Sequence, residues 1–158
     1  MSKSNTMIAG AALLLALALP AASGAQSRAD ASKQPVQYGA DAGEYTSNGI
    51  ALRGRAELTQ GGNRLRADAI TMTTVNGEPS RAEATGNVYL VTPDQSMRGD
   101  RAVYTLGNGE IVVTGDVILT QGKNVLTGNR LVYNVRTESA RMEGGNGRVQ
   151  GVFYPQGN

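Results

Sequence analysis

The sequence predicts an all-β fold, a stack of antiparallel strands arranged in units of about thirty residues. Three observations predict it: a recurring glycine motif, alternation of apolar and polar residues around each motif, and no helical periodicity after residue 25. In the motif a glycine is followed fourteen residues later by an acid or an amide, and successive glycines lie 32 and 29 residues apart. The pairs are Gly54 with Asp68, Gly86 with Asp100 and Gly115 with Asn129, and Gly144 is a fourth candidate glycine 29 residues further on.

The first 25 residues are predicted to be a cleaved signal peptide. Lys3 supplies the positive charge, residues 7–19 form a continuous apolar run, and small residues precede a cleavage site after Ala25. Since the run is shorter than the roughly 20 residues that cross a bilayer, we expect an exported, soluble chain; an uncleaved membrane anchor is the alternative. Residues 26–37 are predicted to be a flexible lead-in, residues 38–154 one folded domain, and residues 155–158 a frayed tail.

Composition excludes several classes of chemistry. The chain has no cysteine and no histidine, which removes disulfides, thiol catalysis, lipid attachment through cysteine, the usual general base and the commonest metal ligand. The 15 Lys and Arg residues fall to 14 when Lys3 leaves with the signal peptide, against 13 Asp and Glu residues, so the mature chain is nearly neutral. We therefore expect no nucleic-acid partner, no metal site and no cofactor.

The first long strand of each unit is predicted by period-two alternation on either side of the repeated glycine. Three copies keep the same parity, which is typical of half-buried antiparallel strands, and a one-residue slip would expose every apolar side chain. The predicted inward positions are Ile50, Leu52, Gly54, Ala56 and Leu58 in the first copy, Ala82, Ala84, Gly86, Val88 and Leu90 in the second, and Ile111, Val113, Gly115, Val117 and Leu119 in the third.

The second strand of each unit is predicted from shorter apolar alternation after a polar turn. Turns are expected at residues 60–63, 93–96 and 121–124 within units, and at 75–79, 106–109 and 135–138 between units. Residues 41–45 resemble a truncated leading copy. The inward positions of the second strands are Ile70 and Met72, Ala102 and Tyr104, and Leu131 and Tyr133.

The repeated glycine and acid are predicted to have structural roles. A glycine on the inward face permits a bend or close approach of the opposite wall, and a short polar side chain braces a turn. Asp68 and Asp100 could also be read as a catalytic carboxylate pair. Positions that recur at each repeat favour the scaffold role, and the third copy holds Asn129, which cannot act as an acid or base.

The predicted interior is aliphatic and built from small residues, since the whole chain holds one Phe and no Trp. Two small sheets filled by Ala, Val and Gly would make a thin core for a filled sandwich. The sheets must therefore either press close together or splay and leave a groove. A splayed aliphatic groove would accommodate acyl chains.

The repeats resemble those of the OstA-like family of periplasmic lipopolysaccharide-export proteins, to which LptA belongs. The resemblance covers residues 38–154 and is carried by two full copies, with a weaker third. The full copies are AEATGNVYL (82–90) with MRGDRAVY (97–104) and VTGDVIL (113–119) with LTGNRLVY (126–133); the weaker is LRGRAEL (52–58) with LRADAITM (65–72). Asn129 in place of Asp, and Arg55 in place of Asn or Asp, depart from the pattern.

The resemblance implies an antiparallel β-jellyroll, a taco-like two-sheet stack that works without catalysis in the periplasm. It implies that the interior holds the acyl chains of lipopolysaccharide, and that jellyrolls join head to tail between the inner-membrane jellyroll partner LptC and the outer-membrane translocon LptD. An exposed strand edge at residues 147–154 would allow such joining, unless the tail folds over it.

Thirteen inward residues are predicted to contact lipid: Leu52, Leu58, Ile70, Met72, Val88, Leu90, Tyr104, Ile111, Val113, Val117, Leu119, Leu131 and Tyr133. Three alternatives remain at this point. They are a membrane-anchored jellyroll subunit of the same export system, a secreted carbohydrate-active β-solenoid, which would need paired carboxylates in one groove, and a structural module with a dry interior.

Overall fold

The structure, a computed structural model, describes residues 34–155. The predicted signal peptide with its cleavage site after Ala25, most of the predicted lead-in, and residues 156–158 of the predicted tail lie outside this range. In residues 34–155, no helix has the length and apolar character needed to span a membrane.

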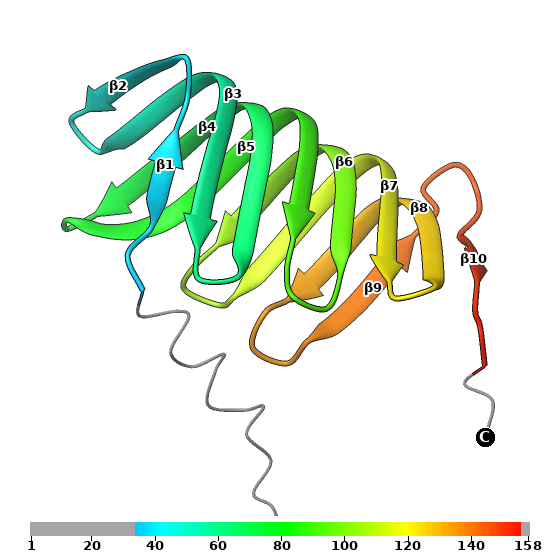
Figure 1. Cartoon of the computed structure of the whole chain (residues 1–158). Helices are drawn as coiled ribbons and strands as arrows, with labels where there is room; N and C mark the ends of the chain where they lie inside the picture. Colours follow the sequence, from blue (N-terminus) through cyan, green and yellow to red (C-terminus); the bar gives the residue numbers. More distant parts are fainter. Residues whose placement is uncertain (1–33, 156–158) are drawn as a thin grey trace, which may run out of the picture.

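The described chain folds into antiparallel strands, which confirms the predicted all-β class (Figure 1). The short strands β1 and β2 precede six long strands, and the short strands β9 and β10 follow them. The strands are β1 (Gln37–Gly39), β2 (Ala42–Thr46), β3 (Gly49–Gln60), β4 (Asn63–Val75), β5 (Glu78–Val91), β6 (Ser96–Thr105), β7 (Glu110–Gln121), β8 (Asn124–Asn134), β9 (Ser139–Glu143) and β10 (Gln150–Val152). The predicted turns between the long strands lie where expected.

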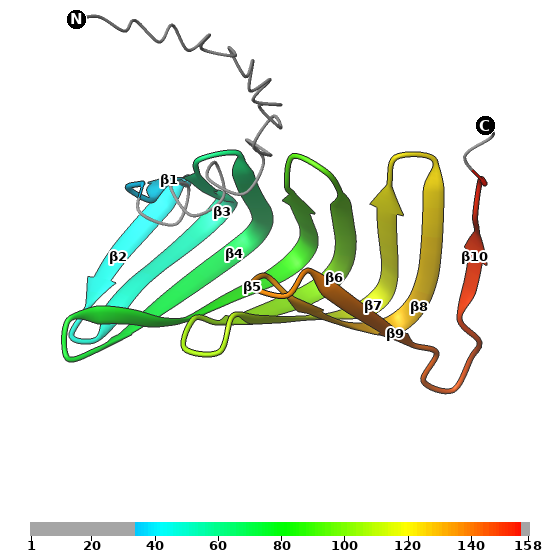
Figure 2. The same cartoon turned by 90° about the horizontal axis from the view of Figure 1, so that it is seen from below.

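The predicted two-sheet stack is formed by one continuous sheet, because each long strand bends near its middle and contributes to two walls. Figure 2 shows the two walls diverging from this bend. The first wall ends in β2, which pairs with residues 49–53 of β3, and in β9, which pairs with residues 130–134 of β8. The second wall ends in β1, paired with residues 57–59, and β10, paired with residues 125–127. We call each bent strand a rung and the line of bends the corner.

The corner is made by pairs of residues in the left-handed region of backbone conformation. Gly86 and Asn87 have φ of +76° and +50°, and Gly115 and Asp116 have φ of +83° and +43°. The strand pairing shifts register at each of these pairs. Two left-handed residues in an extended strand make a bulge and turn its direction. The first of them is glycine because a side chain there is strained, so the predicted bend is confirmed.

Each corner acid lies against the glycine of a neighbouring rung and not against the glycine that precedes it by fourteen residues. A Cβ added to Gly86 would lie 2.9 Å from the Cβ of Asp68 and closer still to its carboxylate. Gly115 meets Asp100 in the same way. The Asn87 amide donates a 3.0 Å hydrogen bond to Asp68. The acids therefore brace the corner from rung to rung.

The same contact recurs at both ends of the sheet. Asp41 lies against Gly54, as expected for a leading copy of the repeat, and Arg55 Nε donates a 2.9 Å hydrogen bond to its carboxylate. Arg55 thus replaces the amide donor used at the next rung. At the other end, the prediction that Gly144 is the fourth glycine of the repeat was wrong by one position. Gly145 has the left-handed φ of +60° and lies against Asn129, because the loop after β9 places it there.

Candidate functional site

The thirteen residues predicted to contact lipid all lie inside the folded sheet. They belong to one apolar cluster or pack against it, and we call this cluster the hydrophobic wedge. Ten are buried: Leu52, Ile70, Val88, Leu90, Ile111, Val113, Val117, Leu119, Leu131 and Tyr133. Leu58, Met72 and Tyr104 are half-buried against the others.

The wedge draws its side chains from both walls. Leu52, Ile70, Met72, Tyr104, Ile111, Val113, Leu131 and Tyr133 come from the first wall, and Leu58, Val88, Leu90, Val117 and Leu119 from the second. Since they form a single cluster, the walls meet through their side chains. Apart from the hydroxyl of Tyr133, the buried residues of the described range are apolar, and none of them is charged, so the interior surface is largely apolar.

On most strands the exposure of wedge residues rises with distance from the corner; Met97 on β6, which is level with Leu119, is an exception at 1%. On β7, Val113 and Val117 flank the corner and are 1% and 0% exposed, whereas Ile111 and Leu119, one step further out, are 7% and 8% exposed. The outer positions of β3 and β4 include the half-buried Leu58 and Met72. The wedge is therefore tightest at the corner and becomes accessible towards the hairpin turns.

Among the residues of the wedge that were missed from the sequence are Leu65, Met97 and Leu126. Met97 is 1% exposed, and Leu65 and Leu126 are half-buried against the cluster. They were missed because each second strand changes parity at its corner acid, so that its inward positions before and after the corner are not in phase. A usable signal was present, since all three open the aligned second-strand blocks with an apolar residue.

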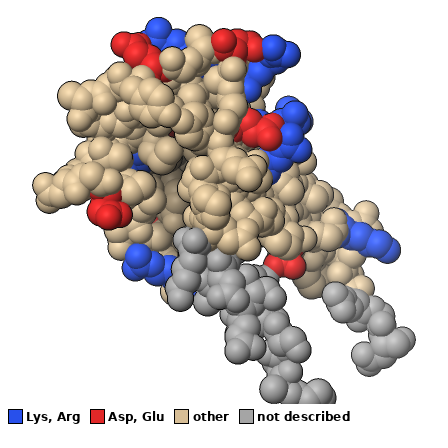
Figure 3. Space-filling view, turned by 60° about the vertical axis from the view of Figure 1, so that its left-hand side comes forward, with Lys and Arg blue, Asp and Glu red and all other residues tan. Residues whose placement is uncertain are grey.

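Charged side chains lie on the outer face. Figure 3 shows one face of the molecule, with Lys, Arg, Asp and Glu mostly around its periphery. Glu83 on β5 accepts hydrogen bonds from Arg101 of β6 at 2.7 Å and from Arg81 at 3.3 Å. Glu57 is held in the same way by Arg64 and Arg66. Hydrogen bonds from these guanidinium groups hold the pKa of both carboxyls below the usual value.

The alternative of a catalytic carboxylate pair has no geometric support. Asp68 and Asp100 are exposed on the outside of the corner, and each braces a different glycine. Asp68 is bonded to an asparagine amide and not to a second carboxylate. Nor do Asp and Glu residues of the described range gather in a group suited to a metal ion.

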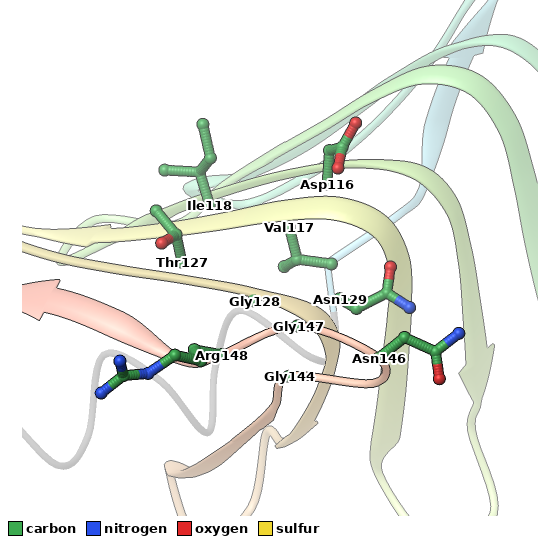
Figure 4. Close-up of a pocket in the computed structure, with 10 residues that line it drawn as sticks. All are labelled: Asp116, Val117, Ile118, Thr127, Gly128, Asn129, Gly144, Asn146, Gly147 and Arg148. Carbon is green, nitrogen blue, oxygen red and sulfur yellow. The ribbon is translucent and has the colours of Figure 1, made fainter.

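A hollow of about 610 Å³ lies at the C-terminal end of the corner. It forms because β9 ends opposite Arg130 and β10 begins opposite Thr127, so that residues 144–149 loop away from β8. Figure 4 shows this loop beside Asn129, with Val117 and Asp116 projecting from opposite sides of β7. Val117 belongs to the wedge and also lines the hollow, although it is fully buried, so the hollow lies directly beside the C-terminal end of the wedge.

Comparisons with known proteins agree with this architecture. Residues 25–139 match the family model described as LptA/(LptD N-terminal domain) LPS transport protein. Protein R00383 of Rhizobium meliloti (strain 1021), which is uncharacterized, is 29% identical over 161 residues, covering 93% of this chain and 87% of that protein.

Among solved structures, LptH is described as the LptA homologous periplasmic component of the conserved lipopolysaccharide transport device from Pseudomonas aeruginosa. It is similar in fold, with a TM-score of 0.71 at 20% identity, over 78% of this chain and 97% of that chain. This likeness confirms the predicted jellyroll.

Proposed function

The chain belongs to the family of LptA and the LptD N-terminal domain, lipopolysaccharide transport proteins, and from this premise we propose that it is a non-enzymatic periplasmic bridge for lipopolysaccharide. In this proposal the hydrophobic wedge holds the acyl chains. The apolar interior supports it, because its half-buried outer residues Leu58, Met72 and Tyr104 offer accessible apolar surface between the walls.

The energetics favour such a carrier. Each methylene removed from water contributes about 0.8 kcal/mol, so an acyl chain of roughly ten methylenes would cost on the order of 8 kcal/mol to expose. Apolar burial is non-directional. A lipid that leaves one rung for the next therefore exchanges one aliphatic surface for another, and its free energy changes little along the wedge.

The ends of the sheet support the proposal of head-to-tail joining, both between copies and with LptC and LptD. The terminal strands β1, β2, β9 and β10 have only one strand neighbour each. Large apolar side chains are exposed beside them, Tyr45 at one end and Phe153 at the other, 77% and 75% respectively. Strand addition would pair the free backbone groups and cover these side chains. Sedimentation velocity over a range of protein concentrations tests the self-association.

Photo-crosslinking tests the lipid site. A benzophenone amino acid at Val88 or Val117, inside the wedge, should capture lipopolysaccharide under ultraviolet light. The matched controls are the adjacent corner positions Asn87 and Asp116, whose side chains lie on the other face, and they should capture none. Equal capture from both faces would overturn the assignment of the wedge as the lipid site.

The closest competing proposal is a membrane-anchored jellyroll subunit of the same system. It differs in retaining the apolar run at residues 7–19 as an anchor. Mass spectrometry of the mature protein separates the two, because cleavage after Ala25 leaves Gln26 at the N-terminus. An intact N-terminus in the membrane fraction would favour the anchored subunit.

A further inference from the structure

The short strands β1 and β2 carry two tyrosines on the inward faces of opposite walls. We call the end of the wedge beside these strands its N-terminal mouth, and the end beside β9 and β10 its C-terminal mouth. Tyr38 of β1 is in register with Leu58 on the second wall, and Tyr45 of β2 is in register with Ile50 on the first wall. Residues directly opposite each other in an antiparallel pair have side chains on the same face. Since Leu58 and Ile50 belong to the wedge, both tyrosine side chains project towards its N-terminal mouth.

The two tyrosines meet. Their hydroxyl groups are hydrogen-bonded to each other, and because β1 and β2 belong to different walls, this bond spans the interior. The hydrogen bond to the Tyr45 hydroxyl raises the pKa of Tyr38 above its ordinary value, and either hydroxyl can donate to the other. Both tyrosines are exposed at the end of the sheet, Tyr38 by 47% and Tyr45 by 77%, so their hydrogen bond lies at the mouth.

No other rung of the described strands has this feature. The inner rungs have an aliphatic or thioether side chain on at least one wall at this distance from the corner; on β6, Tyr104 lies on the first wall and Met97 on the second. At the C-terminal mouth the inward positions are Met142 and Ala140 on β9, opposite Leu131 and Tyr133, and Gly151 on β10, opposite Leu126. A hydrogen-bonded tyrosine pair therefore lies across the N-terminal mouth. At the C-terminal mouth, these inward positions of β9 and β10 hold small or flexible residues, beside the hollow at residues 144–149.

We infer that Tyr38 and Tyr45 form a gate across the N-terminal mouth of the wedge, closed by their hydroxyl–hydroxyl hydrogen bond and opened when an acyl chain passes. The inference rests on the proposed function, since a gate has a role only if lipid moves through the wedge. It gives the two mouths different properties: the tyrosines must part before lipid crosses the N-terminal mouth, so release through that mouth depends on their hydrogen bond.

The closed state is tested first without lipid. Photo-oxidation with a ruthenium tris-bipyridyl complex and persulfate couples tyrosines that lie side by side into fluorescent dityrosine. Wild-type protein should form intramolecular dityrosine joining the peptides that contain Tyr38 and Tyr45, identified by mass spectrometry. Tyr38→Phe should abolish this product and Tyr89→Phe, an exposed tyrosine on the outer face, should not. Absence of the 38–45 product from wild-type protein would overturn the gate.

The gate's effect on lipid is tested by release kinetics. Fluorescently labelled lipopolysaccharide is bound, then chased with unlabelled lipopolysaccharide, in wild-type protein, in the double variant Tyr38→Phe/Tyr45→Phe and in the dityrosine-locked protein. The double variant keeps both rings, so only the hydrogen bond is lost. Its release should be about two- to tenfold faster, the range that corresponds to one net hydrogen bond, and the locked protein should release more slowly than wild type.

Crosslinking at Val117 separates the gate from the proposed function. If Val117 captures lipopolysaccharide in all three proteins and their release rates are equal, the gate is refuted and the carrier proposal stands. If Val117 captures none even in wild-type protein, the carrier proposal fails. Tyr89→Phe should release lipid at the wild-type rate, and faster release from it would refute the assignment of the effect to the mouth.

Discussion

Replacing Gly86 with alanine isolates the contact that forms the corner. The change places a Cβ in a backbone with φ of +76°, and 2.9 Å from the Cβ of Asp68. The left-handed conformation costs an L residue about 1–2 kcal/mol, and overpacking costs about 1–3 kcal/mol more. We therefore expect the free energy of unfolding to fall by roughly 2–5 kcal/mol, measured by urea titration followed by far-ultraviolet circular dichroism.

Two other glycines are matched controls that separate the two costs. Gly122 has a φ of +59° and nothing within 4 Å of an added Cβ, so Gly122→Ala should lose only the conformational part, about 1–2 kcal/mol. Gly107 has neither a left-handed φ nor a close neighbour, and Gly107→Ala should be neutral or stabilising. In an Asp68→Gly background, which removes both the carboxylate and the Cβ that an added side chain would meet, Gly86→Ala should cost no more than Gly122→Ala does. Equal losses at Gly86 and Gly122 with Asp68 present would refute the corner contact.

Two further predictions concern the interior and the outer face. Leu131→Ala should lower the free energy of unfolding by about 2–5 kcal/mol, because Leu131 is fully buried. Val152→Ala, at an exposed position, should change it by less than about 0.5 kcal/mol. Similar losses for the two variants in urea titrations would contradict the burial pattern. Glu83 has a pKa lowered by its hydrogen bond to Arg101 from an ordinary 4.5, so its carboxylate stabilises the fold above about pH 4.5 and loses this effect as the pH falls through the folded-state value. The urea midpoint of Glu83→Gln should therefore lie below wild type at pH 7 and converge with it in acid, and a gap that persists in acid would contradict the linkage.

Much of the fold was predictable because strand alternation and turn chemistry are local. Positions such as Val88 and Leu90 showed their inward face through period two alone, and the Asn76-Gly77 turn, with φ of +53° and +81°, has the residues that a tight hairpin requires. The bend at each repeated glycine was also predictable, since a recurring glycine on the inward face of a strand has few other uses.

What could not be predicted depends on register across the bulges. The motif joins Gly86 to Asp100 in the sequence, yet the acid that touches Gly86 is Asp68, because contact follows the neighbouring strand and not the spacing along the chain. The change of parity at the corner acids also hid Met97. The Tyr38–Tyr45 pair was invisible for a similar reason: only the folded sheet shows that β1 and β2 belong to opposite walls.

The corner contact from rung to rung has a consequence for the evolution of length. Because Asp68 meets Gly86 as Asp100 meets Gly115, one hairpin docks on the next through the same interface, and stability is set largely by nearest neighbours. Duplicating the segment that spans β5 and β6 would insert two strands and lengthen the molecule by about 9–10 Å without altering either terminus. Duplication of a hairpin is thus a modular route by which proteins of this architecture could come to span different distances.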